Sequence, residues 1–414
     1  MKRRLLLLLA LYACAGVLWA QQILNIDLSA TRQVANYNLG TFVKVTYAFP
    51  TVTPAGNDTI MHGAIAMTDS VYYGQREARG LILNHQYTLT NASGCASLNP
   101  SMSMESMLLS DKYLLYSGTG SNFIIVTTDN YGFGCSVVNK QAYLYGDITA
   151  VNALDGLLAA KQVLAALHIG YGDILASVGY SQGGHSSMAT LKVAESISKY
   201  QQLKFDCVIC GAGPYDLDEI YNIYFTPGAY VKYPVALPLI FSNITAIEQM
   251  KGNPAFATYS DANLYTAPLA RNIARWYNGR LHGDEINQQI FSLYGATDSV
   301  KVALLASPTL ADSTTTLARA YRQVIHRNSL NHSWQPSTRT KIYLFHYLND
   351  EVVPVECTYN MAKFLRSCGL TDRNLQTIIY QPSDIERQYH ITTHGAIGAP
   401  FIHYASSILL GIKQ

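Results

Sequence analysis

The sequence predicts an α/β fold in which a mostly parallel central sheet is flanked by helices. Short apolar runs of strand length alternate along the chain with longer segments whose apolar residues recur at helical spacing. A hydrophobic content of 49% with only 14% charged residues is enough for a large buried core. In such folds ligands bind beyond the carboxyl ends of the parallel strands, and glycine, tyrosine and polar clusters follow these runs here.

The strands begin with an antiparallel pair. Two β-rich runs within residues 43–67 flank a turn at residues 53–58, which predicts an opening hairpin. Helical patterns, such as residues 148–167, separate several of the apolar runs that follow, as expected for parallel strands joined by helices. The predicted parallel strands are residues 81–85, 123–128, 174–178, 207–210, 342–346 and 376–380.

The alternation then stops for about 120 residues, far longer than an ordinary connection, so we interpret this segment as an insertion. Helical patterns at residues 269–277 and 317–325 predict a largely helical cap or lid over the strand ends. The apolar run 235–241 belongs either to the core of this cap or to the wall of a pocket. The predicted division is a signal peptide at 1–20, a first core part at 21–217, the cap at 218–338 and a second core part at 339–414.

The N-terminus has the features of a signal peptide. Basic residues at positions 2–4 precede an apolar run that ends near Ala20 and is shorter than the roughly 20 residues that span a bilayer. Cleavage near Ala20 would give an exported protein, periplasmic or secreted. Lipoprotein anchoring at Cys14 is the weaker alternative, because Tyr12 is atypical of a lipoprotein box and the apolar run continues beyond the cysteine. No later segment is predicted to span a membrane.

Charge and cysteine content limit the partners. A formal net charge of +2 without a basic patch argues against nucleic acid. The pair Cys207 and Cys210 lies within an apolar strand and has no second pair of ligands, so we expect no metal site there.

Disulfide formation is possible in an oxidising compartment, where an even number of cysteines follows the signal peptide. Cys95 and Cys135 lie in loops that should leave neighbouring strands at the same edge, which favours a bridge between them. Cys357 and Cys368 bracket one predicted helix and would be about 16 Å apart, too far for a bridge.

The motif with the most specific chemistry is a nucleophile elbow. Residues 179–183 read G-Y-S-Q-G and match the G-x-S-x-G pattern, which holds a serine on a strained turn between a strand and a helix. An apolar strand precedes this stretch and a helical pattern at 185–197 follows it, as the motif requires. Ser181 is therefore the candidate nucleophile. The backbone N–H of Gln182, at the start of the helix, is the first candidate donor to an oxyanion.

A serine nucleophile needs a base, and the base needs a group that orients it. With this elbow the partners follow along the chain in the order serine, acid, histidine. The strand at 342–346 ends in a turn that carries Asp350, the predicted acid, with Glu351 as the alternative and helix capping as the competing role for Asp350. Two histidines, His390 and His394, follow the last strand. We predict His394, because it stands directly ahead of the closing helix, with His390 as the alternative.

With these parts placed, the chain resembles the α/β-hydrolase superfamily and, within it, the Candida lipase A-like secretory lipase family. Residues 128–134 are similar to that family's D-Y-x-G-x-G turn, and residues 141–145 look like its H-P-Y-L block, followed by a helix from residue 150. The elbow is the third block. The resemblance covers most of the mature chain, and it implies Ser181, Asp350 and His394 as the catalytic triad and the insertion as a helical lid.

The loop after the first parallel strand departs from the family, because residues 85–87 read His-Gln-Tyr where His-Gly is usual. We expect the second oxyanion donor to be the backbone N–H of Gln86 or Tyr87, with His85 as a structural residue. Asp129, placed like the family's turn aspartate, is expected to bond loop amides. His185, just after the elbow, is expected to pack rather than to ionise.

These observations predict a secreted serine hydrolase that cleaves small-molecule or lipid carboxylic esters through an acyl-enzyme, without a metal or organic cofactor. One alternative is an exported serine peptidase, because the same triad hydrolyses amides. The cap has no obvious acidic pair to hold a peptide amine, which favours esters. A non-catalytic binding protein that retains the fold is the other alternative, and all three triad residue types in the right order argue against it.

Overall fold

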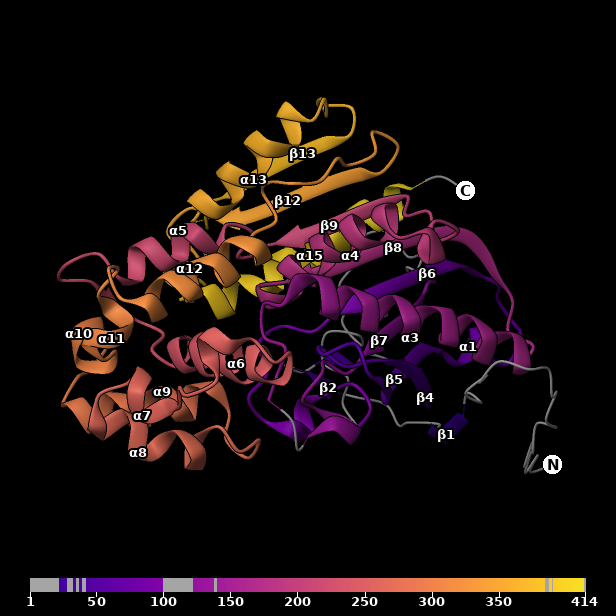
Figure 1. Ribbon diagram of the computed structural model, residues 1–414. Coiled ribbons are helices and arrows are strands. Elements are labelled where there is room, and N and C mark those ends of the chain that lie inside the picture. The colour runs from indigo at the N-terminus through magenta and orange to yellow at the C-terminus, as the bar shows by residue number, and fades with distance from the viewer. Residues whose placement is uncertain are drawn as a thin grey trace.

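The protein is described by a computed structural model that covers residues 22–27, 33–34, 37–38, 42–99, 122–137, 140–383, 387–388 and 390–412. The predicted signal peptide, with Cys14 and Ala20, lies outside the described residues. Figure 1 shows a central sheet with helices on both faces and a group of helices gathered beyond one end of it.

Within the described residues, nine strands form one sheet in the order β1-β4-β5-β7-β6-β8-β9-β12-β13. From β7 to β13 neighbouring strands run parallel, whereas β1, β4 and β5 pair antiparallel. The mostly parallel α/β fold and the opening hairpin are thus confirmed. The bounds are β1 Gln22–Asp27, β4 Phe42–Val52, β5 Asp58–Thr68, β6 Ala78–His85, β7 Ile124–Thr128, β8 Tyr171–Tyr180, β9 Cys207–Gly211, β12 Lys341–Tyr347 and β13 Leu375–Tyr380. A separate short pair joins β2 Gln33–Val34 to β3 Tyr37–Asn38.

Two hydrophobic clusters lie on opposite faces of the sheet, because successive strand side chains alternate in direction. Leu81 and Leu83 of β6 belong to the cluster that also contains residues of α3 (Gly146–Ala166), α4 (Gln182–Ser196) and α13 (Glu356–Ser367). Ile82 belongs to the other cluster, with residues of α15 (His394–Gly411). A short helix, α1 (Asp69–Tyr72), follows β5. Helices therefore cover both faces of the sheet.

Helix α3 is more apolar than expected from the sequence. By length and apolar content it is the one helix among the described residues that could cross a membrane, which corrects the expectation that no later segment would qualify. Since 67% of its apolar window is buried inside the protein, against the sheet and α4, its place in the core accounts for its apolar character.

The segment between β9 and β12 is mainly helical and lies at the left in Figure 1. Its predicted helices at 269–277 and 317–325 correspond to α8 and α12, and we call residues 218–338 the cap segment. A short antiparallel pair, β10 (Tyr230–Val231) and β11 (Val300–Lys301), lies within it. Its helices are α5 Leu217–Tyr224, α6 Ala236–Met250, α7 Asp261–Leu264, α8 Ala267–Trp276, α9 Gly283–Tyr294, α10 Val302–Leu305, α11 Pro308–Ala311 and α12 Thr316–Asn328. Helix α5 begins one residue before the cap segment.

The apolar run 235–241 serves both of the roles considered for it. Val235 and Leu237 are buried in the hydrophobic core. Ile240 and Phe241 of α6 also line a small, mainly apolar cavity of about 20 Å³, together with Tyr143 and other residues. The cap segment therefore packs on the loop that precedes α3.

The predicted Cys95–Cys135 bridge is wrong for this structure, in which both thiols are free. Cys95 is buried with its Sγ 3.8 Å from Ser97 Oγ, whereas the thiol of Cys135 donates to the carbonyl of Ile60 at 3.1 Å. The two loops thus direct their thiols toward different partners. Helix α13 runs without a break between Cys357 and Cys368.

Candidate active site

Ser181 lies at the sharp turn between β8 and α4, with φ 58° and ψ −122°. A non-glycine residue in this region of positive φ is strained, and the surroundings must hold it there. A Cβ on Gly179 would lie 2.1 Å from the carbonyl oxygen of Gly183, and a Cβ on Gly183 would lie 2.3 Å from that of His85. Both motif glycines are therefore required by close backbone approach. Helix α4 begins directly after Ser181, three residues earlier than the helical pattern indicated.

The structure brings Ser181, His394 and Asp350 together from the end of β8, the start of α15 and the turn after β12. His394 Nε2 lies 2.8 Å from Ser181 Oγ, and His394 Nδ1 lies 2.6 Å from Asp350 Oδ2. Because a carboxylate can only accept, Nδ1 carries the proton and donates it to Asp350. Nε2 of the neutral ring then accepts the hydrogen bond from the Ser181 hydroxyl. The base is thus held in the tautomer that can take the serine proton.

The carboxylate of Asp350 is fully buried and held by several donors. Its Oδ1 accepts from the backbone N–H groups of Val352 at 2.9 Å and Val353 at 2.8 Å. Burial alone would raise the pKa of Asp350, but electrostatic attraction to His394 and the hydrogen bonds from His346 and His394 outweigh it and hold the pKa well below its usual range. Asp350 therefore remains a carboxylate beside the imidazole.

A second histidine, His346 of β12, also faces Asp350. Its Nε2 lies 2.9 Å from the carbonyl oxygen of Val353 and 3.5 Å from Asp350 Oδ2, so this nitrogen carries a proton. Its Nδ1 lies 2.6 Å from the hydroxyl of Thr358, and the side chain is fully buried. From the sequence, His346 was expected only to form part of a strand. The one feature that could have indicated its role is its position near the end of an apolar strand that leads into the turn carrying Asp350.

The main chain of His394 is held at both of its polar groups. Its N–H donates to both oxygens of the Glu351 carboxylate, at 2.9 and 3.1 Å. Its carbonyl accepts from the Tyr180 hydroxyl at 2.7 Å, and the Tyr180 and His394 rings lie 5.1 Å apart. Tyr180, which precedes Ser181, and Glu351, which follows Asp350, therefore both hold the backbone of His394 in place. Sequence reasoning found neither contact, because each depends on the relative placement of distant loops.

The alternatives to Asp350 and His394 take other places. Glu351, considered as the acid, contacts the backbone of His394 rather than its ring. His390 is exposed, and its N–H donates to the carbonyl of Arg387 at 3.1 Å. The structure therefore sets His394, and not His390, between serine and acid.

The candidate oxyanion donors lie around the first turn of α4. Gln182 is the first residue of the helix, so its N–H has no intrahelical acceptor. The approach of Gly183 to the backbone of His85 and Gln86 brings the loop after β6 against the elbow. Gln86 is buried and its side chain donates to the carbonyl of Gly94 at 3.2 Å, whereas Tyr87 is 42% exposed.

Nearby polar residues have structural contacts. Asp129 accepts from the backbone N–H of Ser97 at 2.9 Å and from its hydroxyl at 2.6 Å, which confirms the expected contact with a loop amide. His85 is buried beside Thr190, and burial lowers its pKa to about 3. His185 is also buried, with Nε2 3.2 Å from the carbonyl of Asn328 in α12, a contact with the cap segment that the sequence did not suggest.

Known proteins resemble this chain in fold rather than in sequence. No protein-family model and no curated protein sequence matches it. The rice cell wall degrading esterase LipA from Xanthomonas oryzae aligns with a TM-score of 0.73 and 18% identity over 94% of this chain and 98% of the esterase. Candida antarctica lipase A in its closed state aligns with a TM-score of 0.56 and 15% identity over 87% of this chain and 77% of the lipase. The chain therefore has the α/β-hydrolase fold, which it shares with lipase A, as its sequence motifs predicted.

Proposed function

We propose that this protein is an exported serine hydrolase that cleaves carboxylic esters through an acyl-enzyme. The observation that carries the proposal is the hydrogen-bonded series in which His394 lies 2.8 Å from Ser181 Oγ and 2.6 Å from Asp350 Oδ2. Nucleophile, base and orienting acid are each within the reach that proton transfer requires. Export would follow cleavage near Ala20.

In the proposed mechanism His394 Nε2 takes the proton of Ser181 as Oγ attacks the ester carbonyl. The negative charge that develops on the carbonyl oxygen is stabilised by the backbone N–H of Gln182 and by that of Gln86 or Tyr87. His394 then returns the proton to the leaving alcohol, which leaves the acyl group on Ser181. Water, activated by the same imidazole, attacks the acyl-enzyme and releases the acid.

Asp350 supports both halves of this cycle. Its carboxylate stays charged because the depressed pKa opposes protonation, so it stabilises the imidazolium that forms whenever His394 holds two protons. No step requires a metal or an organic cofactor. The residues proposed to do chemistry are therefore Ser181, His394 and Asp350.

Esters are preferred over amides as the substrate class on two grounds. The structural relatives are described as an esterase and a lipase, although identities of 18% and 15% carry only the fold. The second ground is that the sequence of the cap segment has no obvious acidic pair to hold a peptide amine. We propose that the substrate is a small-molecule or lipid ester and that the cap segment acts as the lid over its site.

The test is hydrolysis by the purified mature protein of p-nitrophenyl esters of graded acyl length and of aminoacyl p-nitroanilides. We expect turnover of esters, with a maximum at one range of acyl length, and little turnover of anilides. Preferential hydrolysis of the anilides would replace the esterase proposal with a peptidase. Absence of turnover together with absence of labelling by a fluorophosphonate would favour a binding protein.

A further inference from the structure

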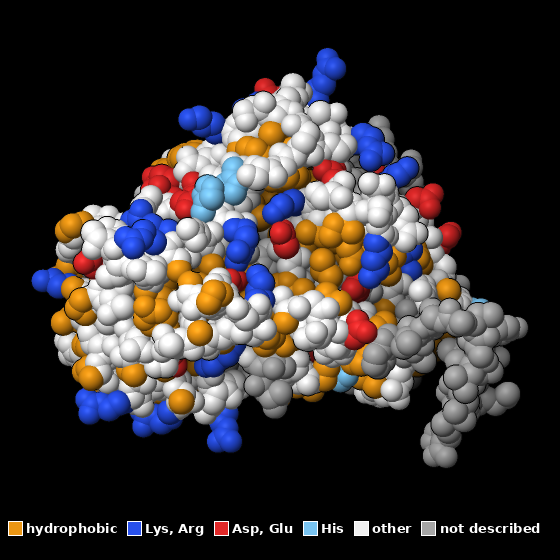
Figure 2. Space-filling view, viewed as in Figure 1, with side chains coloured by type: hydrophobic (Ala, Val, Ile, Leu, Met, Phe, Trp, Pro, Cys, Tyr) orange, Lys and Arg blue, Asp and Glu red, His pale blue; other side chains and the backbone are white. Residues whose placement is uncertain are grey.

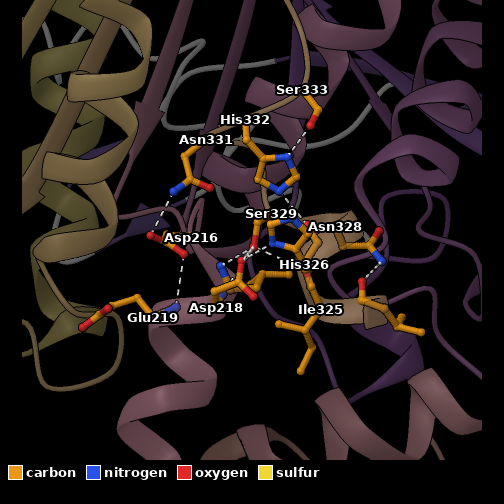
Figure 3. Close-up of polar contacts among 12 residues, drawn as sticks. Asp216, Asp218, Glu219, Ile325, His326, Asn328, Ser329, Asn331, His332 and Ser333 are labelled. Atoms are coloured by element: carbon orange, nitrogen blue, oxygen red, sulfur yellow. Dashed lines mark hydrogen bonds and ion pairs between the residues drawn. The ribbon is translucent and has the colours of Figure 1, made fainter. Parts of the chain in front are cut away.

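The two ends of the cap segment meet beside the core. The Ser329 hydroxyl accepts from the backbone N–H of Leu217 at 3.0 Å and of Asp218 at 3.3 Å. The N–H of Leu330 donates to the carbonyl of Tyr215 at 2.7 Å. The start of α5 and the chain leaving α12 are thus joined by polar contacts, and Figure 3 shows this junction. A ligand that bridges the start of α5 and the chain after α12 would therefore stabilise the packing of the cap segment on the core.

Three side chains with metal-binding atoms lie on the outside of this junction. Asp218, His326 and His332 each offer one ligand atom, and these atoms lie within 4.8 Å of one another. His326 Nδ1 is 2.8 Å from Asp218 Oδ2, and the two imidazole rings stack at 4.2 Å with their planes 13° apart. The site is accessible, because the side chain of His326 is 63% exposed. Figure 2 shows histidine beside acidic side chains on the surface over α5 and α12.

The hydrogen bonds of His332 leave one ring nitrogen suited to a metal ion. Its Nε2 lies 2.7 Å from the carbonyl oxygen of His326, so Nε2 carries the proton. Nδ1 of the neutral ring then has an electron pair that can accept, and in this structure it accepts from the hydroxyl of Ser333 at 2.7 Å, pointing toward Ser333 rather than toward Asp218 and His326 (Figure 3). Histidine ligands commonly donate their other N–H to a backbone carbonyl in this way, which fixes the tautomer. Ser333 is exposed, so its hydroxyl can turn to water when an ion takes its place.

We propose that Asp218, His326 and His332 form a binding site for a divalent transition metal ion, with zinc as the best match. Zinc takes imidazole nitrogens and carboxylate oxygens at about 2.0–2.2 Å, which places tetrahedral ligand atoms about 3.3–3.5 Å apart. One ligand atom from each of the three side chains lies within 4.8 Å of the others, and His326 Nδ1 is 2.8 Å from Asp218 Oδ2, so small side-chain shifts can reach that spacing. Calcium and magnesium are poorer matches because they prefer oxygen ligands. The fourth position would hold water.

Binding requires a local rearrangement. The electron pair of each ring nitrogen lies in the plane of its ring, so the ring of His332 must turn away from Ser333 and the two stacked rings must tilt toward a common ion. Both rings lie at the surface or only partly buried, which allows this movement. The bound ion would link α5 to the chain after α12 and so strengthen the base of the cap segment. The proposal does not depend on the proposed ester hydrolysis.

The experiment is calorimetric titration of the full mature chain, freed of metal with a chelator, with zinc chloride. We expect one ion per chain and a zinc-dependent rise in Tm, because an ion that binds only the folded protein stabilises it. His326→Asn and His332→Asn should each weaken binding by at least about tenfold. Cobalt in place of zinc should give the visible absorption bands of a tetrahedral site in the wild type.

The matched control is His282→Asn, which changes another exposed cap histidine, one whose backbone N–H donates to the carboxylate of Glu285. This variant should bind zinc as the wild type does. Tm measured without metal tests whether each variant is folded. Binding of zinc with equal affinity by the wild type and by either His326→Asn or His332→Asn, or no stoichiometric binding by the folded wild type, would overturn the proposal.

Discussion

The carboxylate of Glu351 accepts the backbone N–H of His394 with both of its oxygens, at 2.9 and 3.1 Å. The acid beside the orienting Asp350 therefore holds the main chain of the histidine whose ring Asp350 orients. Tyr180 completes this support from the other side, since its hydroxyl donates to the carbonyl of His394 at 2.7 Å.

Glu351→Ala should lower kcat/KM for a p-nitrophenyl ester by about tenfold to a hundredfold, because a hydrogen bond to a charged group contributes about 1.5–3 kcal/mol. Glu351→Gln keeps an oxygen that can accept from His394 and should lose only a few-fold. Steady-state kinetics of both variants, with circular dichroism as the check on folding, measures the difference. Wild-type activity in Glu351→Ala would show that this contact does not position the base.

The two histidines of the last loop can be separated by substitution. His394→Ala should lower kcat by several orders of magnitude, because the triad acts as a unit. Asp350→Asn should lower it by about 10⁴-fold, since an amide can favour the wrong imidazole tautomer. His390→Ala should remain close to the wild type. A large loss in His390→Ala with normal activity in His394→Ala would reverse the assignment of the base.

The sequence predicted the sheet, and it indicated the three residues that the structure brings together at the candidate site, because both rest on local patterns. Apolar runs of strand length predicted the parallel strands, and the elbow at residues 179–183 combines a motif with its flanking strand and helix. The order of residue types then indicated Asp350 and His394. Even so, choosing His394 over His390 relied on its position ahead of a helix, and the distances to Ser181 required the three-dimensional structure.

The contacts that sequence reasoning missed join residues that are far apart in the chain or face each other across a turn. Tyr180 reaches His394 from the elbow, and His346 faces Asp350 only because the turn after β12 folds back. The Cys95–Cys135 prediction failed for a related reason. Loops at the same edge of a sheet can still direct their side chains apart, and the thiol of Cys135 bonds the carbonyl of Ile60.

Two buried histidines should make the folded state sensitive to acid. Burial lowers the pKa of His85 to about 3 and, with small contributions from its neighbours, that of His185 to about 4. Below the unfolded value of about 6.5 the unfolded chain takes up protons that the folded chain does not, so stability falls as the pH falls. From pH 7 to pH 5, each histidine should reduce the free energy of unfolding by about 2 kcal/mol.

Urea unfolding at pH 7 and pH 5 measures this loss. His85→Gln should show a drop between the two pH values that is about 2 kcal/mol smaller than that of the wild type, whatever its stability at pH 7. His282→Gln, at an exposed position, should leave the drop unchanged. Equal drops in the wild type and His85→Gln would contradict a neutral buried His85.

The most direct test of the account is the site at which a fluorophosphonate attaches. The probe reacts with a serine whose proton is taken by a neighbouring base, so its adduct identifies the residue that His394 activates. Peptide mass spectrometry of the labelled mature protein should locate the adduct on Ser181, and folded Ser181→Ala should take up no label. Labelling at another serine, or labelling that persists in Ser181→Ala, would contradict Ser181 as the nucleophile.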